Sequence, residues 1–300
     1  MDYLTVDPAT RRLYVPRGTR TMVIDAVSGE TLGDIPGQKV AHGVAIVPKL
    51  NRGFITDGGG GGSVTVFNLK SNELLGVIRA LPDADGIIYD PGTDRILVSA
   101  GDSNSLITFK PDIDPKSGKI EEPIALGGAP EFLAADGAGK VFVNLADKDS
   151  VAVVDLRARK VLARWPVAPG GKPVGLALDR EHHTLLIGCR KPQKMIVMST
   201  EDGKVLADLP IGAGVDATRV AGSEAFASCA DGTLAVIDRS PEGQYSVKQP
   251  VPTANRAKTM DIDMMTHTIY LPTADFEDPA SGGGRPAAKP GSFKILVVSR

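Results

Sequence analysis

Short apolar runs, typically of about five residues, recur along the whole chain between turn-forming residues. Arg12–Val15, Thr21–Ile24 and Val151–Val154 are examples. Runs of this length, rich in Val, Ile, Leu and Thr and bounded by Gly, Asp, Asn or Ser, are typical of β-strands. No segment sustains the apolar period of about 3.6 residues that a helix needs, so the pattern predicts an all-β chain.

The predicted strands group into a unit that recurs seven times. The first strand of each unit ends at Asp7, Val47, Asp90, Asp136, Asp179, Ala221 and Asp263. These spacings match the length of about 40–45 residues that is usual for a four-stranded propeller blade. Radial repetition also hides the edges of so many short strands. We therefore expect one domain, 1–300, that forms a seven-bladed β-propeller of four-stranded antiparallel blades. The blades would cover about 1–38, 39–81, 82–128, 129–170, 171–213, 214–255 and 256–300.

The last unit contains only three of the expected strands. Its apolar runs are Met260–Met264, His267–Leu271 and Phe293–Val298, and the last blade should therefore lack its fourth strand in this chain. We expect the natural protein to carry an additional N-terminal strand, preceded by an export signal. The residues from Met1 to Asp7 contain neither the basic segment nor the apolar stretch of a signal peptide.

The second strands of several units share a sequence signature. They read Val141-Phe142-Val143-Asn144, Leu13-Tyr14-Val15-Pro16 and Ile269-Tyr270-Leu271-Pro272. This signature resembles that of the YVTN family of bacterial β-propellers, and all seven units fit it. The resemblance implies a seven-bladed propeller located in the periplasm or at the cell surface. It implies no particular activity, since one fold of this kind serves many functions.

Equivalent positions of the units should meet at the mouth of a central channel, because the loops that lead into the innermost strands share one face of a propeller. Five residues before the end of each first strand stand Asp2, His42, Asp85, Glu131, Val174, Asp216 and Lys258. Six of these seven residues are ionisable. They could cap backbone N–H groups of adjoining blades, or they could bind a ligand or metal ion. The variety of residue types favours the second interpretation.

A second circle of residues follows the second strands and includes Asn144, Cys189 and Cys229. The two cysteines occupy matching positions in neighbouring units. Two free buried thiols, a disulfide, and a soft-metal role shared with His42 all remain open. Oxygen ligands combined with an imidazole suit one divalent ion such as Ca²⁺, Mn²⁺ or Zn²⁺. The candidate metal ligands are His42, Glu131, Asn144 and Asp216.

Composition narrows the choice of function. The formal net charge of -2 and the single tryptophan argue against nucleic acid binding, and no apolar run is long enough to insert into a membrane. We expect an exported, monomeric recognition or scaffold propeller that holds a small molecule, a metal ion or a partner protein at its channel face. The candidate ligand-binding residues are Asp2, His42, Asp85, Glu131, Asn144, Cys189, Asp216, Cys229, Arg256 and Lys258.

An enzymatic alternative remains open. A metal-dependent hydrolase or lactonase could hold a divalent ion at the channel mouth, where the ion would polarise a lactone carbonyl and activate a bound water. Asp85 would then be the candidate general base, and Lys258 or Arg256 would steer an anionic substrate. The sequence contains no motif that identifies a nucleophile, so it does not decide between enzyme and binding protein.

Overall fold

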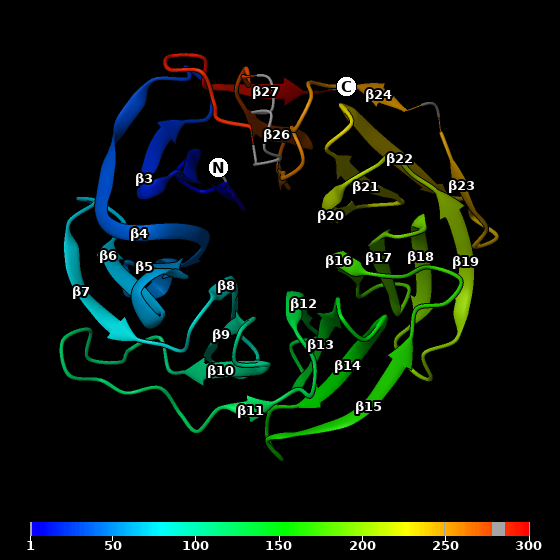
Figure 1. Ribbon diagram of the computed structural model, residues 1–300, viewed down its shortest axis with the longest axis horizontal. Coiled ribbons are helices and arrows are strands. Elements are labelled where there is room, and N and C mark those ends of the chain that lie inside the picture. The colour runs from blue at the N-terminus through cyan, green and yellow to red at the C-terminus, as the bar shows by residue number, and fades with distance from the viewer. Residues whose placement is uncertain (1, 249, 278–285, 300) are drawn as a thin grey trace.

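The computed structural model describes residues 2–248, 250–277 and 286–299. Antiparallel β-sheets stand around a central axis, with the first strand of each sheet nearest the centre (Figure 1). Two single-turn 3₁₀ helices, Pro48–Leu50 and Gly59–Gly61, lie in connecting loops. No helix in the described part of the chain has the length and apolar character that would let it cross a membrane.

The strands follow one another around the ring in chain order. The first sheet comprises β1 (Thr5–Asp7), β2 (Arg12–Pro16), β3 (Gly18–Asp25), β4 (Thr31–Val47), β5 (Arg52–Asp57), β6 (Ser63–Asn68) and β7 (Leu74–Arg79). The next two comprise β8 (Ala84–Asp90), β9 (Arg95–Ala100), β10 (Ser105–Phe109) and β11 (Ile124–Ala125), then β12 (Pro130–Ala135), β13 (Lys140–Leu145), β14 (Ser150–Asp155) and β15 (Lys160–Pro166).

The remaining three sheets complete the ring. One comprises β16 (Pro173–Asp179), β17 (Thr184–Arg190), β18 (Gln193–Ser199) and β19 (Val205–Pro210). Another comprises β20 (Val215–Ala221), β21 (Glu224–Cys229), β22 (Thr233–Arg239), β23 (Tyr245–Val247) and β24 (Val251–Pro252). The last has three strands, β25 (Asp261–Asp263), β26 (Thr268–Thr273) and β27 (Lys294–Val298).

The prediction of seven separate four-stranded blades is wrong. Strands β1–β7 form a single seven-stranded sheet, and five further sheets follow it. The cause is β4, which is 17 residues long and pairs with β3 from Thr31 to Ala41 and with β5 from Ala41 to Val47. We expected the first unit to end near residue 38, but the backbone stays extended there. Gly37, with a φ of 102°, lets this continuous strand change direction without a break.

Apolar side chains from neighbouring sheets fill the space between them. Phe54 of β5 packs on Phe109 of β10, with ring centroids 5.9 Å apart, and both rings are buried. Burial of side chains of this size stabilises the fold by roughly 1.5–3 kcal/mol each. The strands are short and rich in branched apolar residues because each one contributes to a core on one or both faces of its sheet.

The first and the last sheet lie side by side and close the ring. The backbone N–H of Val6 donates to Asp261 Oδ2 at 2.9 Å, and Thr259 Oγ1 donates to the carbonyl of Asp2 at 3.1 Å. The hydroxyl of Tyr270 also donates to the carbonyl of Ala26 at 3.3 Å. These contacts bring Asp2 next to residues that are distant in sequence.

Candidate functional site at the channel face

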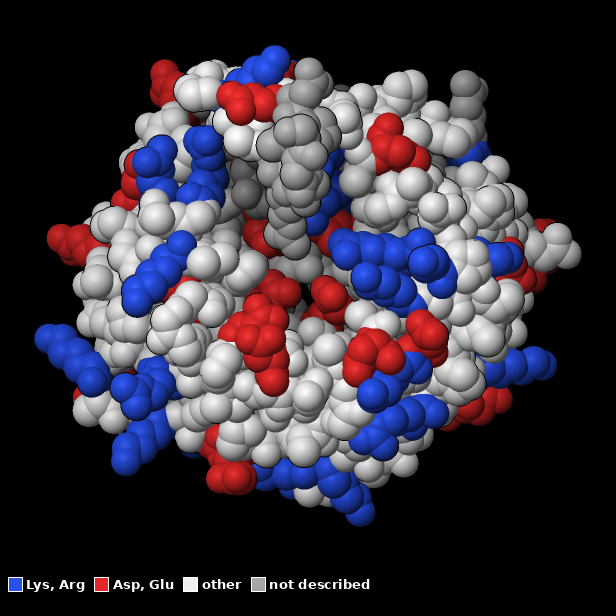
Figure 2. Space-filling model, in the orientation of Figure 1, with Lys and Arg blue, Asp and Glu red and all other residues white. Residues whose placement is uncertain are grey.

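The face at which the innermost strands β8, β12, β16 and β20 begin is called the channel face here. Residues of the predicted ring stand at this end of the innermost strands: Asp2 precedes β1, His42 lies in β4, Asp85 in β8, Glu131 in β12, Val174 in β16 and Asp216 in β20, and Lys258 precedes β25. Acidic side chains gather around the central opening of the molecule (Figure 2). The residues that lie five positions before the ends of the predicted first strands are therefore neighbours in space.

An imidazole and two carboxyl groups form the centre of the acidic side, here called the acid–imidazole cluster (Asp2, His42 and Asp85). His42 Nδ1 lies 2.8 Å from Asp2 Oδ2 and 3.4 Å from Asp85 Oδ1. The contact with Asp2 is a hydrogen bond, whereas the buried Oδ1 of Asp85 accepts no hydrogen bond. The ligand atoms of the cluster lie within 4.8 Å of one another, so this cluster could hold a metal ion.

The imidazole of His42 occupies space that is open because Gly58 has no side chain. A Cβ placed on Gly58 would lie 2.8 Å from His42 Nε2, closer than carbon and nitrogen atoms tolerate. Gly58 follows β5, and its backbone N–H donates to the carbonyl of Val40 in β4 at 3.0 Å. The pairing of β4 with β5 therefore positions His42 against a stretch of backbone that has no side chain.

Electrostatics within the cluster change the pKa of each group. Burial lowers the pKa of His42, but the hydrogen bond that its ring donates to Asp2 and the charges of Asp85, Asp2 and Asp83 outweigh it and raise the pKa to about 9. Burial, followed by the charge of Asp2, raises the pKa of Asp85 well above its usual value, although His42 opposes this. His42 is therefore a cation at neutral pH, and Asp85 holds its proton more tightly than an exposed aspartate.

The opposite side of the mouth is built on a buried ion pair network. Asp216, whose side chain is 4% exposed, binds Arg190 through one carboxylate oxygen and Lys258 through the other. Arg190 is also held by its Nε donating to the carbonyl of Val215 at 2.8 Å. Burial raises the pKa of Asp216, and the two cations act in the opposite direction. Each charge on this side has a partner, which a buried carboxylate requires.

Glu131 lies between the two sides. Burial raises its pKa, and so do the charges of Asp216 and Asp83, whereas Arg190 and Lys258 lower it. The groups that influence one another across the mouth are five carboxyl groups and three basic groups: Asp2, Asp83, Asp85, Glu131 and Asp216 against His42, Arg190 and Lys258. Carboxyl groups therefore outnumber basic groups at the mouth.

Two aromatic rings line the channel below the mouth, together with mainly aliphatic residues. Tyr3 is buried with its ring 4.2 Å from that of Phe132 in an edge-to-face arrangement, and both rings line a cavity of about 250 Å³. Burial raises the pKa of Tyr3 well above its usual value, and the charges of Asp85, Asp216, Asp2 and Glu131 add to this effect. The Tyr3 hydroxyl therefore remains protonated, and it experiences the field of the carboxyl groups on both sides of the mouth.

Asn144 and Arg256, which were also predicted to bind a ligand, contact other residues of the protein. The fully buried amide of Asn144 donates to the carbonyls of Val174 and Gly175 at 2.9 and 3.0 Å, which ties β13 to β16. The Arg256 guanidinium lies over the ring of Phe276, 4.9 Å from its centroid. Of the predicted ligands His42, Glu131 and Asp216, only His42 belongs to the group of described histidine, cysteine and acidic residues whose ligand atoms lie close together.

Both cysteines are free and buried. Cys189 packs among residues of the sheets that begin with β12, β16, β20 and β25, whereas Cys229 belongs to a separate cluster between β16–β19 and β20–β23. Burial raises the pKa of each thiol to about 12, so neither is a thiolate at neutral pH. Of the three alternatives that the sequence left open, the structure has two free buried thiols.

Three residues of the mouth were not predicted. Arg190 directly follows Cys189, so a count shifted by one residue along the second strands would have found it. Asp83 and Tyr3 each lie within two residues of a predicted ring residue. Their importance depends on neighbours from other sheets, such as Asp216 for Arg190 and Phe132 for Tyr3.

A ring of antiparallel sheets with innermost strands around a channel defines a β-propeller. Comparison with solved structures supports this class. A chain of Kuenenia stuttgartiensis hydrazine synthase is similar, with a TM-score of 0.79 and 13% identity, over 99% of this chain and 95% of that chain. A chain of the mitotic checkpoint complex matches with a TM-score of 0.80 and 12% identity, over 100% of this chain and 90% of that chain.

A third solved structure leads to the same conclusion. The β-propeller domain of Myceliophteria thermophila Cps50 (Swd1) has a TM-score of 0.72 and 10% identity, over 100% of this chain and 96% of that chain. At these identities the likeness confirms the β-propeller fold alone. No protein-family model and no curated protein sequence matches the chain. Membership of the YVTN family therefore stays a prediction.

Proposed function

We propose that this protein is a recognition propeller that binds a cationic ligand at its channel face. The observation that carries the proposal is the excess of carboxyl groups at the mouth, with Asp85 and Glu131 both shifted toward the protonated form. Burial is the main cause of both shifts and neighbouring carboxylates add to them, so an entering positive charge would stabilise the ionised carboxylates. The acid–imidazole cluster is where such a charge would gain most, because its two carboxyl groups share one internal cation, His42, whereas Asp216 alone binds two.

The geometry of the cluster suits a compact cation. A divalent ion bound at roughly 2.0–2.6 Å from each ligand can bridge atoms up to about 5 Å apart. The ligand atoms of Asp2, His42 and Asp85 fall within this span, and His42 would release its proton to bind a metal ion. The buried Asp85 Oδ1, which accepts no hydrogen bond, supplies an acceptor for the ion or for an ammonium group.

The hydrolase alternative gains no support from the described residues. Asp85, its candidate general base, lies against His42, and Asp216 is paired with Arg190 and Lys258. The NH₂ group of Asn144 donates to two backbone carbonyls, while its buried Oδ1 accepts no hydrogen bond. A recognition role requires only that the ligand binds at the mouth. We therefore propose the recognition role alone.

Calorimetric titration with CaCl₂, MnCl₂, ZnCl₂ and putrescine, each in chelator-free buffer, tests the proposal. We expect saturable binding of at least one of these cations, and we expect Asp85→Asn to weaken it by about tenfold or more, because a charge-assisted contact is lost. Glu201→Gln removes one negative charge from an exposed turn and is the matched control. Absence of saturable binding by all four cations, or equal weakening in the control, would refute the proposal.

We also propose that the protein is exported, which the resemblance of its second strands to the YVTN signature supports. The test is fractionation of the native cells followed by immunodetection. Recovery of the protein in the periplasmic or surface fraction is the expected result, and recovery in the cytoplasm alone would contradict it.

A further inference from the structure

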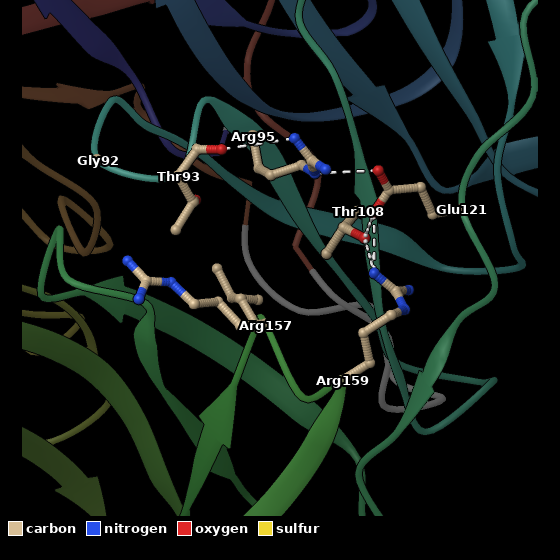
Figure 3. Close-up of a pocket in the computed structure, with 8 residues that line it drawn as sticks. Gly92, Thr93, Arg95, Thr108, Glu121, Arg157 and Arg159 are labelled. Atoms are coloured by element: carbon tan, nitrogen blue, oxygen red, sulfur yellow. Dashed lines mark hydrogen bonds and ion pairs between the residues drawn. The ribbon is translucent and has the colours of Figure 1, made fainter.

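We propose that a second site, on the side of the ring opposite the channel face, binds a small molecule that carries a phosphate monoester. The site is a cavity of about 560 Å³ between the sheet β8–β11 and the sheet β12–β15 (Figure 3). Strand β8 connects the two sites, since Asp85 stands near its beginning and the cavity lies beyond its end, roughly 20 Å away along a seven-residue strand. This inference does not depend on the proposed function.

Two turns form the walls of the cavity and are held rigidly. In the turn between β8 and β9, Gly92 packs against the backbone of the neighbouring sheet, and a Cβ there would lie 1.8 Å from the carbonyl oxygen of Gly137. In the turn between β14 and β15, Asp155 Oδ1 accepts the backbone N–H groups of Arg157 and Ala158 at 2.8 and 2.9 Å. Leu156, which is buried, anchors this second turn and gives the cavity an apolar wall.

Glu121 joins two of the three arginines that line the cavity. Its Oε1 lies 3.0 Å from Arg95 Nε, and its Oε2 lies 2.9 Å from Arg159 Nη1 and accepts the Thr108 hydroxyl at 2.7 Å. Burial would raise the pKa of Glu121, but the Thr108 hydrogen bond and the two arginines lower it below its usual value. Glu121 is therefore ionised and offsets one positive charge.

The third arginine, Arg157, has no such partner. It is exposed, and within the described part of the chain its guanidinium takes part in no hydrogen bond or ion pair. In Figure 3 the Arg157 side chain extends toward the Thr93 side of the cavity, whereas Arg95 and Arg159 converge on Glu121. The cavity thus has three guanidinium groups and one carboxylate among its lining residues, which leaves an excess of two positive charges.

Phosphate is the ligand chemistry that this arrangement fits. A guanidinium presents a planar fork of N–H donors that matches phosphate oxygens, and a phosphate monoester carries close to two negative charges at neutral pH. The cavity volume lies in the range of small-molecule sites, and Leu156 supplies apolar contact for the organic part of the ligand. Arg95 and Arg159 are fixed by Glu121, so they provide a rigid positive wall, and Arg157 is free to close on the ligand.

Calorimetric titration at low salt and with EDTA present tests the inference. The probes are phenyl phosphate, benzoate and benzyl alcohol, which share one ring and differ in charge. We expect phenyl phosphate to bind most tightly and benzyl alcohol not to bind. Arg157→Gln should weaken phenyl phosphate binding by about tenfold. Arg157→Lys should weaken it less, because the charge remains while the fork is lost.

Matched controls separate the site from general electrostatics. Lys160→Gln removes a positive charge next to Arg159, outside the cavity lining, and should leave binding nearly unchanged. Asp85→Asn should have no effect, since it alters only the channel face. No binding of millimolar phenyl phosphate, equal weakening by Lys160→Gln, or binding of benzyl alcohol as tight as that of phenyl phosphate would overturn the site. Benzoate binding as tight as that of phenyl phosphate would overturn its assignment to phosphate.

Discussion

The stability of this protein should fall as pH rises from about 6.5 to 9, because His42 releases a proton in that interval. The carboxylates around it raise the pKa of His42 in the folded protein from 6.5 to about 9. A group with a raised pKa in the folded state stabilises fully below its unfolded value of about 6.5, and this contribution is lost as pH rises through the folded value. Asp85, whose pKa is also raised, acts in the same direction as pH rises above the usual value of an aspartate.

The size of the effect follows from the shift of the His42 pKa. A shift from 6.5 to about 9 corresponds to roughly 3 kcal/mol, since each pKa unit is worth about 1.4 kcal/mol. The His42 side chain is only 18% exposed, so solvent screening removes a modest part of this. His42→Gln removes the titrating group and should abolish this part of the pH dependence.

Urea unfolding at pH 6, 7.5 and 9.5 in the presence of a chelator measures the difference. We expect the free energy of unfolding of the wild type to fall by about 2–3 kcal/mol more than that of His42→Gln over this range. His183→Gln, which changes an exposed histidine in the turn after β16, should follow the wild type. Parallel pH profiles for the wild type and His42→Gln would refute the electrostatic account of the channel face.

Three further outcomes follow from the structure. Gly58→Ala should reduce stability by about 1–3 kcal/mol in urea unfolding, because the new methyl group would lie 2.8 Å from His42 Nε2, whereas the φ of −73° at Gly58 suits alanine and adds no backbone strain. Asn144→Ala should cost about 2–4 kcal/mol in the same assay, since the buried carbonyls of Val174 and Gly175 lose their donor. The two cysteines should react with a thiol reagent only after unfolding, and rapid modification of the native protein, followed by mass spectrometry, would contradict their burial.

The ring of charged residues was accessible from sequence because strands have a fixed rise. Counting back from the last residue of each innermost strand aligns Asp2, Asp85 and Asp216, and a constant rise of about 3.3 Å per residue turns equal counts into equal heights along the axis. The same argument could not reveal what each side chain touches. Asn144 occupies an aligned position, yet its partners are carbonyls of the next sheet, which no local pattern encodes.

The sheet boundaries were harder to predict for a physical reason. A Pro36-Gly37 pair normally marks a turn, and the repeat length placed a blade boundary next to it. The chain instead bends at Gly37 and continues in an extended conformation, so β4 pairs on both of its edges. Whether a glycine ends a strand or bends it depends on what the following residues pair with, and here Ala41 pairs with Asp57 as well as with Gly18.

A nearly neutral chain can still present two sites of opposite sign. The formal net charge of -2 conceals an excess of carboxyl groups at the channel face and an excess of guanidinium groups in the cavity at the other end of β8. Both proposed sites should lose affinity as salt rises, since the proposed ligand of each is an ion. The two sites should differ in the ion that competes with a bound ligand. A divalent cation should displace a ligand from the channel face, and a phosphate should displace a ligand from the cavity. Global charge therefore predicts neither site, and only the local arrangement of charged groups separates them.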